Sequence, residues 1–243
     1  MQVQERAENI VQWLKSILAK SGAKGFVIGL SGGVDSAVAA VLCKRACPDT
    51  TLGVMMPCFS DPQDLLDAQL LADAFSIPVE KIVLDDIFET FVRALTGEPY
   101  DRSKKDLSIA NIKPRLRMTT LYFLASRRKL LVVGTGNKSE IAIGYYTKYG
   151  DGGVDLLPIG NLVKTQVREF ARCLGVPQEI IDKAPSAGLW AGQTDEAEMG
   201  VTYEELDRYI LNGESSSPEA RAIIDSMVKC SAHKKMLPPV PPL

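Results

Sequence analysis

The sequence predicts a doubly wound α/β fold, in which helices cover both faces of a mostly parallel sheet. Short apolar runs alternate with segments of helical periodicity as far as residue 134, and this alternation is typical of successive β-α-β units. A glycine turn joins the first apolar run to its helix, and in such sheets ligands bind near turns of this kind. Because 243 residues suffice for one sizeable domain, we expect residues 1–243 to form a single unit.

The first half of the chain has the clearer periodicity. Short apolar runs bounded by turn residues predict buried strands at 26–30, 51–57, 79–84 and 130–134. Apolar residues with helical spacing predict helices at 3–20, 34–44, 61–75, 87–95 and 109–129. Ser21-Gly22 ends the first helix, and Asp61-Pro62 begins the third. The polar stretch 97–108 has little to bury, so we expect it to be a surface loop.

The second half is less regular. Residues 145–158 mix aromatic, charged and glycine residues without periodicity, so we expect a loop of the kind that often binds ligands. Within 160–175 a loop leads into a helix that starts near Lys164. Two further helices are expected at 203–211 and 218–232, before a tail whose prolines favour an extended chain.

Composition excludes several classes of protein. A formal net charge of −2 does not suit a broad nucleic-acid-binding face. The five cysteines are odd in number and form no CxxC pair, which argues against a disulfide framework and a zinc knuckle. No apolar run approaches the length of a membrane span, and the N-terminus lacks the apolar region of a signal peptide. We therefore expect a soluble cytoplasmic protein that binds neither nucleic acid nor membrane.

The glycine turn is the strongest candidate site. In SGGVDS, the string from Ser31 to Ser36, two glycines allow backbone N–H groups and the start of a helix to converge on an anion such as a phosphate. Val34 and Asp35 stand where a Walker A loop has lysine and Ser or Thr. Asp35 would also repel a bound pyrophosphate unless a cation lay between them. The alternative is an ordinary strand-to-helix turn with Asp35 in the first turn of the helix.

Two later residues could join this turn. Glu140 follows a second glycine-containing turn, Thr135-Gly136-Asn137, and could share a magnesium ion with Asp35, although taken alone it is more typical of a solvated acid at a helix start. Lys164 lies at a helix start, where a cation is disfavoured unless an anion is near. These residues favour a site for phosphate and a metal ion.

Residues 184–200 are rich in small and acidic side chains, with one tryptophan that we expect to be exposed. The composition suggests few core residues and therefore a lid over the site. Disorder without a function is the alternative.

The string SGGVDS resembles the pyrophosphate-binding loop of the N-type ATP pyrophosphatases. Later stretches resemble, in order, the signatures of ammonia-dependent NAD synthetases: NIKPRLRM, GTGNKSE, YYTKYGDGGVDLLP and KAPSAGLWAGQTDEAEMGVTYEELD. The resemblance extends from Gly25 to Lys235 and implies an adenine-nucleotide alpha-hydrolase-like, Rossmann-like fold. It implies ATP-dependent amidation of deamido-NAD with ammonia through an acyl-adenylate, and a homodimer.

The resemblance also implies roles for single residues. It assigns ATP to Gly29, Leu30, Ser31, Gly32, Gly33, Val34, Asp35, Ser36, Thr135, Lys164 and Ser186. Asp35, Lys164 and Ser186 would take part in catalysis, and Asp35 and Glu140 would hold Mg²⁺. It assigns deamido-NAD to Arg115, Lys148, Asp155, His233 and Lys234. His233 and Lys234 would otherwise be read as part of a solvated basic tail.

Two departures and several alternatives remain. Many relatives carry Thr where Ser186 stands, which keeps the hydroxyl, and some carry Asp-His in place of Gly136-Asn137. No amidase segment precedes Gly25, so glutamine hydrolysis is not expected. Alternatives are a GMP-synthetase-like amidation module, a tRNA thiolation enzyme or a sensor that binds ATP without turnover. The apolar surface of helices 3–18 and 109–129 gives a separate reason to expect a dimer.

Overall fold

Four parallel strands form one sheet in the computed structural model, which describes residues 2–190 and 192–241. The strands are β1 (Gly25–Gly29), β2 (Thr51–Met55), β3 (Val79–Lys81) and β4 (Leu130–Val133). Their order is β3-β2-β1-β4, so the chain moves to one side of β1 and later returns to the other. The predicted parallel sheet is confirmed. In such sheets the point where the strand order reverses, here between β1 and β4, leaves a crevice for ligands at the carboxyl ends.

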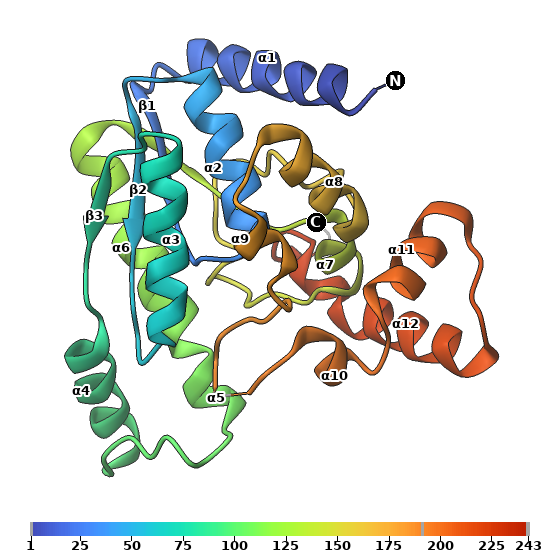
Figure 1. Cartoon of the computed structure of the whole chain (residues 1–243). Helices are drawn as coiled ribbons and strands as arrows, with labels where there is room; N and C mark the ends of the chain where they lie inside the picture. The colour runs from blue at the N-terminus through green and yellow to red at the C-terminus, as the bar shows by residue number, and fades with distance from the viewer. Residues whose placement is uncertain (1, 191, 242–243) are drawn as a thin grey trace.

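One face of the sheet is covered by the larger apolar core. The helices on this face are α1 (Val3–Ser21), α2 (Val34–Ala46), α3 (Pro62–Ala74), α8 (Lys164–Leu174) and α9 (Gln178–Asp182). Helix α2 is buried along nearly its whole length between β1, α1 and α8, which agrees with its run of alanine and valine (Figure 1).

The opposite face is covered by α4 (Asp85–Thr96) and α6 (Ile112–Arg128). The expected single helix at 109–129 is wrong at its start, because a short helix, α5 (Leu107–Ala110), precedes α6. Asp106 caps α5 by accepting hydrogen bonds from the backbone of Ser108 and Ile109. Pro114, which has no N–H to donate, is accommodated in the first turn of α6. Strand β3 is also shorter than predicted, and α4 begins two residues early, at Asp85.

The last part of the chain packs around a third, smaller core beside the sheet. Its helices are α7 (Lys138–Ile143), α10 (Asp195–Met199), α11 (Tyr203–Asn212), α12 (Pro218–Ser231) and the 3-10 turn η1 (Ala232–Lys234). Figure 1 shows α10, α11 and α12 on the side of the molecule away from β3. No helix within the described residues is both long and apolar enough to cross a membrane.

Candidate active site

The glycine turn lies at the carboxyl end of β1 and is tied together by two serines. The Ser36 hydroxyl donates to the Gly33 carbonyl at 2.9 Å and lies 3.0 Å from the Ser31 hydroxyl. Gly32 has a φ of +77°, and a Cβ atom there would come within 2.4 Å of the Asp64 carbonyl oxygen of α3. Gly33, by contrast, has extended backbone with a φ of −96° and caps α2. The turn therefore presents its backbone at the start of α2, as an anion site requires.

A buried lysine connects this turn to the chain that follows β4. The Lys164 Nζ lies 2.5 Å from Asp35 Oδ2 and 3.4 Å from Glu140 Oε1, and its side chain is only 3% exposed. The structure thus brings together three residues that the sequence singled out separately. They meet at the switch point because Asp35 follows β1 and Glu140 follows β4.

The start of α8 is held by two neighbouring helices. Ser139 Oγ of α7 accepts a hydrogen bond from the Lys164 backbone N–H at 3.1 Å and donates to Asp207 of α11. The same carboxylate accepts from the Thr165 N–H at 2.8 Å. Asp207 therefore supplies the negative charge that a helix start favours, while the Lys164 side chain points to Asp35.

Asn137 links the two carboxylates. Its side-chain oxygen accepts the Glu140 N–H at 3.0 Å, and the Glu140 carboxylate accepts the Asn137 N–H at 3.2 Å, which completes a capping box. The Asn137 Nδ2 donates to Asp35 Oδ1 at 2.8 Å. One amide therefore starts α7 and orients Asp35.

Tyr203 and Asp195 also belong to the cluster around Lys164. The Lys164 Nζ lies 4.8 Å from the centre of the Tyr203 ring, and the Tyr203 hydroxyl donates to Asp195 Oδ2 at 2.9 Å. The same hydroxyl lies 3.4 Å from Glu140 Oε1. Asp195 is 4% exposed, and its Oδ1 is a buried atom without a hydrogen-bond partner among the described residues.

The crowding of carboxylates changes how these groups titrate. Burial, followed by the charge of Asp35, raises the pKa of Glu140 to about 8, against the lowering effect of Lys164. Burial alone would lower the pKa of Lys164, but Asp35 and Glu140 outweigh it and raise that pKa. Burial raises the pKa of Asp195. The lysine therefore remains charged, while Glu140 is largely protonated at pH 7 in the metal-free site.

The donor set suits a magnesium ion that is shared with a phosphate ligand. Mg²⁺ prefers carboxylate oxygens and is commonly held by one or two of them together with substrate phosphates. Asp35 and Glu140 supply two carboxylates on either side of a buried cation, each with a side chain 16% exposed. Within the described residues, no three His, Cys, Asp or Glu side chains gather closely enough to bind a metal by themselves. A metal there would complete its coordination with water or with phosphate oxygens of a nucleotide.

The described part of segment 184–200 adds few apolar side chains to the core but buries two polar ones, Gln193 and Asp195. Gln193 is buried because its Oε1 accepts the Leu189 N–H at 2.8 Å and its Nε2 donates to Glu198 at 2.7 Å. Met199 is the buried apolar side chain among the described residues of this segment, so the expectation of few core residues agrees with the structure. Residue 191 of this segment lies outside the described residues.

Two lysines anchor the segment. Lys183 lies 2.7 Å from Asp64 and 2.6 Å from Asp67, both on α3 beside the glycine turn. Lys113, at 2% exposure, donates to the Leu189 carbonyl at 2.8 Å. Ser186, which lies in sequence between Lys183 and Leu189, is exposed, and its hydroxyl accepts a hydrogen bond from the Gly188 N–H.

The five residues expected at deamido-NAD fall in two places. Arg115 donates to the Lys148 carbonyl at 3.4 Å, and the Lys148 ammonium donates to the His233 carbonyl at 2.9 Å. Lys234 donates to the carbonyls of Gly144 and Tyr146. These four residues form one basic surface rather than the solvated tail of the alternative interpretation. Asp155 lies apart, beside β4, where it accepts hydrogen bonds from Tyr122 and Val132.

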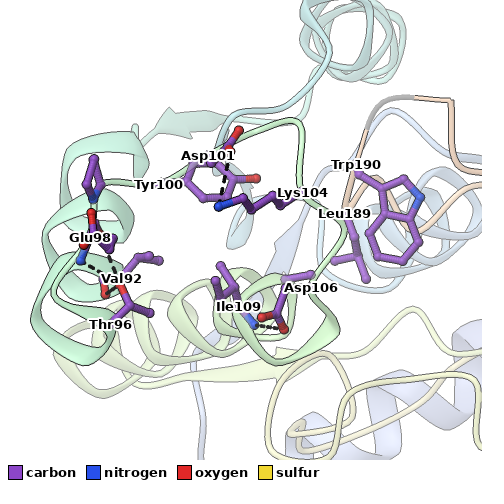
Figure 2. A pocket seen from close by; sticks show the side chains of 12 residues that line it. Val92, Thr96, Glu98, Tyr100, Asp101, Lys104, Asp106, Ile109, Leu189 and Trp190 are labelled. Atoms are coloured by element: carbon purple, nitrogen blue, oxygen red, sulfur yellow. Dashed lines mark hydrogen bonds and ion pairs between the residues drawn. The ribbon is translucent and has the colours of Figure 1, made fainter.

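A cavity of about 250 Å³ lies outside the charged cluster (Figure 2). Trp190 and Leu189 stand on one side of it, and Thr96 and Glu98 on the other. Trp190 is half-buried at this wall, so the expectation that it is exposed is wrong. None of the lining residues belongs to the cluster around Lys164, and we therefore place the candidate chemistry at that cluster.

Sequence reasoning missed four residues of the site: Asn137, Asp195, Tyr203 and Lys113. Asn137 stands three residues before Glu140, which is the spacing of a capping box and was a detectable signal. The other three depend on contacts between segments far apart in the chain and have no local pattern.

The sheet, the glycine turn at its switch point and the buried charges define a doubly wound α/β protein of the nucleotide-binding class. The family model described as NAD synthase matches residues 6–238. A relative from Carboxydothermus hydrogenoformans, named NH(3)-dependent NAD(+) synthetase, is 52% identical over 241 residues, which cover 99% of this chain and 98% of the relative. The chain belongs to the NAD synthase family.

Two solved structures extend the comparison. The NMN synthetase from Francisella tularensis aligns over 100% of both chains with a TM-score of 0.94 and 39% identity. The NH3-dependent NAD synthetase from Campylobacter jejuni aligns over 100% of both chains with a TM-score of 0.80 and 29% identity.

Proposed function

We propose that this protein catalyses the ATP-dependent amidation of deamido-NAD with ammonia, which gives NAD, AMP and pyrophosphate. The observation that carries the proposal is the buried Lys164 between Asp35 and Glu140 beside the glycine turn. This arrangement suits the phosphates and metal of ATP, and the names of the relatives supply the second substrate. The enzyme acts in the cytoplasm as a homodimer, and residues 1–243 work as one unit.

The reaction needs two displacements, because a carboxylate is a poor electrophile. A carboxylate oxygen of the nicotinate attacks the α-phosphorus of ATP, and pyrophosphate leaves with the electron pair of the broken P–O bond. Ammonia then attacks the acyl carbon, the nitrogen loses a proton, and AMP leaves with the electron pair of the C–O bond. Both steps build negative charge that preorganised donors stabilise.

Each residue has a role in this scheme. Backbone N–H groups of the glycine turn hold the phosphates, while Leu30 and Val34 pack in the core beneath them. Lys164 stabilises the charge that grows on pyrophosphate, and the hydroxyls of Thr135 and Ser186 hydrogen-bond to ATP. Mg²⁺, held by Asp35 and Glu140, would neutralise phosphate charge. Arg115, Lys148, Asp155, His233 and Lys234 bind the nicotinate dinucleotide.

A second candidate substrate follows from one comparison. The structure with the TM-score of 0.94 is described as an NMN synthetase, whereas the Campylobacter NAD synthetase aligns at 0.80. The same chemistry on nicotinate mononucleotide would give NMN. The two substrates share the reacting carboxylate, so the cluster around Lys164 serves either one.

A parallel assay separates these candidates. The protein is incubated with ATP, Mg²⁺ and ammonium, and with deamido-NAD, nicotinate mononucleotide or xanthosine monophosphate. We expect NAD, AMP and pyrophosphate in equal amounts from deamido-NAD. Faster conversion of the mononucleotide would establish the second candidate. Turnover of xanthosine monophosphate alone, or ATP binding without turnover of any substrate, would overturn the proposal.

A further inference from the structure

Lys164 occupies the space that a shared metal would need. Its ammonium lies between Asp35 and Glu140, at 2.5 Å and 3.4 Å from their oxygens, and its side chain is buried. A magnesium ion bound to both carboxylates would approach their oxygens to about 2.0–2.1 Å. Two cations cannot share so small a space, because their repulsion in a buried site is strong. The argument rests on the metal role proposed above.

The charges around Lys164 point to a second position for it. Asp195 also interacts electrostatically with the lysine, so three carboxylates face one ammonium. A bound metal favours the ionised form of these acids; once all three are ionised, Lys164 neutralises one charge and a divalent ion neutralises the other two. A buried carboxylate oxygen normally has a donor, yet Asp195 Oδ1 has none among the described residues.

The Lys164 ammonium would have to move only a short distance from Asp35 and Glu140 to Asp195. The Tyr203 hydroxyl reaches both Asp195 Oδ2, at 2.9 Å, and Glu140 Oε1, at 3.4 Å. The ring of the same tyrosine lies under the lysine ammonium. A lysine side chain has four rotatable bonds, so its ammonium can move across this ring while its backbone stays fixed by Ser139.

We propose that, before ATP binds, Lys164 is a displaceable counter-ion: a metal entering between Asp35 and Glu140 moves the lysine ammonium to Oδ1 of Asp195. Asp195 is then a positioning residue, since it acts on the metal site through Lys164. It lies on α10 within the segment 184–200. Metal binding and the placement of that segment are therefore coupled, and each favours the other.

The test measures Mn²⁺ binding to the full-length protein without ATP, by the loss of the free-ion signal in electron paramagnetic resonance. Removal of the competing charge in Lys164→Met should raise the affinity by about tenfold or more. Lys164→Gln is a second variant in case the first does not fold, and circular dichroism verifies folding of both. Asp195→Asn should weaken Mn²⁺ binding in the wild-type background.

The double variant distinguishes relocation from simple electrostatics. If Asp195 acts by receiving the lysine, Asp195→Asn should have a much smaller effect when Lys164→Met is already present. A uniform electrostatic effect would instead weaken binding equally in both backgrounds. Lys183→Met is the matched control, because that lysine also bridges two carboxylates, but these are Asp64 and Asp67 of α3 rather than the proposed metal ligands. Its Mn²⁺ affinity should change little.

Three results would overturn the inference. They are equal Mn²⁺ affinities of the wild type and both Lys164 variants, an equal Asp195 effect in both backgrounds, or no Mn²⁺ binding by any variant. In each case amidation of deamido-NAD by the wild type with Mg²⁺ and ATP would show that the proposed function still stands.

Discussion

Asn137 Nδ2 donates a hydrogen bond to Asp35 Oδ1 at 2.8 Å, although the two residues are 102 positions apart in the chain. The same side chain caps the helix that carries Glu140. One amide therefore sets the distance between the carboxylates that follow β1 and β4.

Replacement of Asn137 separates its two contacts. Asn137→Ala should lower the free energy of unfolding by about 1 kcal/mol through the lost cap and should also lower kcat. Asn137→Ser keeps a hydroxyl that can cap the helix but is too short to donate to Asp35, so it should lose less unfolding free energy than Asn137→Ala while its kcat still falls. Equal kcat values for Asn137→Ser and the wild type would show that the contact with Asp35 is not needed for turnover.

Asp35→Asn should abolish turnover while the fold stays intact. The amide keeps the shape of the side chain but loses the charge that would hold a metal and Lys164. We expect kcat to fall by about a hundredfold or more, as for the loss of a principal electrostatic stabiliser. Steady-state kinetics at saturating Mg²⁺ measure this loss, and a near-normal kcat of Asp35→Asn would contradict the metal role.

Glu140→Gln should change how stability depends on pH. The folded-state pKa of about 8 lies above the usual 4.5, so between these values the folded protein binds the proton more tightly and stability falls as pH rises. Glutamine removes this loss. The difference in unfolding free energy between the variant and the wild type, measured without metal by denaturant titration, should grow by roughly 1–3 kcal/mol in favour of the variant from pH 5 to pH 8. A constant difference would mean that Glu140 titrates normally.

Lys113→Met should loosen the segment 184–200. Lys113 donates to the Leu189 carbonyl and lies 5.6 Å and 5.7 Å from the rings of Phe88 and Tyr100. Methionine keeps the apolar contacts and loses the donor. Amide hydrogen exchange should be faster around Leu189 in the variant, and ATP with deamido-NAD should slow exchange across the segment in the wild type.

A lysine that touches the same segment from outside provides the control. Lys105 lies 6.0 Å from the Trp190 ring and is exposed, so Lys105→Met should leave exchange nearly unchanged. Fast exchange in the wild type with and without both ligands would reject a lid.

Sedimentation at micromolar protein should show a homodimer. Trp13 of α1 is 41% exposed and Phe123 of α6 is 59% exposed, which leaves apolar surface on the two helices expected to form the interface. Mixing inactive Asp35→Asn and Arg115→Ala proteins should restore part of the activity if one site draws residues from two subunits. A fully active monomer would end this hypothesis, while a dimer without complementation would place both residues in one subunit's site.

The sequence predicts the sheet well because the central strands β1 and β2 are buried on both faces and appear as apolar runs, whereas the partly buried β3 is predicted too long. The glycine turn is detectable because it directly follows such a run, and Glu140 because it follows a second turn, Thr135-Gly136-Asn137, at the end of another run. No local sequence pattern predicts that Asp35 and Glu140 both contact Lys164. This arrangement depends on the order of strands β1 and β4, which is a property of the whole sheet.

Local patterns also fail where a polar side chain is buried. Asp195 and Gln193 lie in a stretch whose composition suggests a solvated loop, yet their hydrogen bonds hold them inside the protein. The break between helices α5 and α6 at Asn111 is not predicted for another reason. Asp106 starts a separate short helix, but the apolar periodicity continues across the boundary.

The two glycines of the turn are not equivalent for protein engineering. A side chain at position 32 would clash with the Asp64 backbone and would also have to adopt a left-handed φ. At position 33, by contrast, the nearest atom to an added Cβ is Ser31 Oγ at 3.4 Å. A mutant library that aims to alter nucleotide preference can therefore vary position 33, but diversity at position 32 would mostly yield clones that fail to fold.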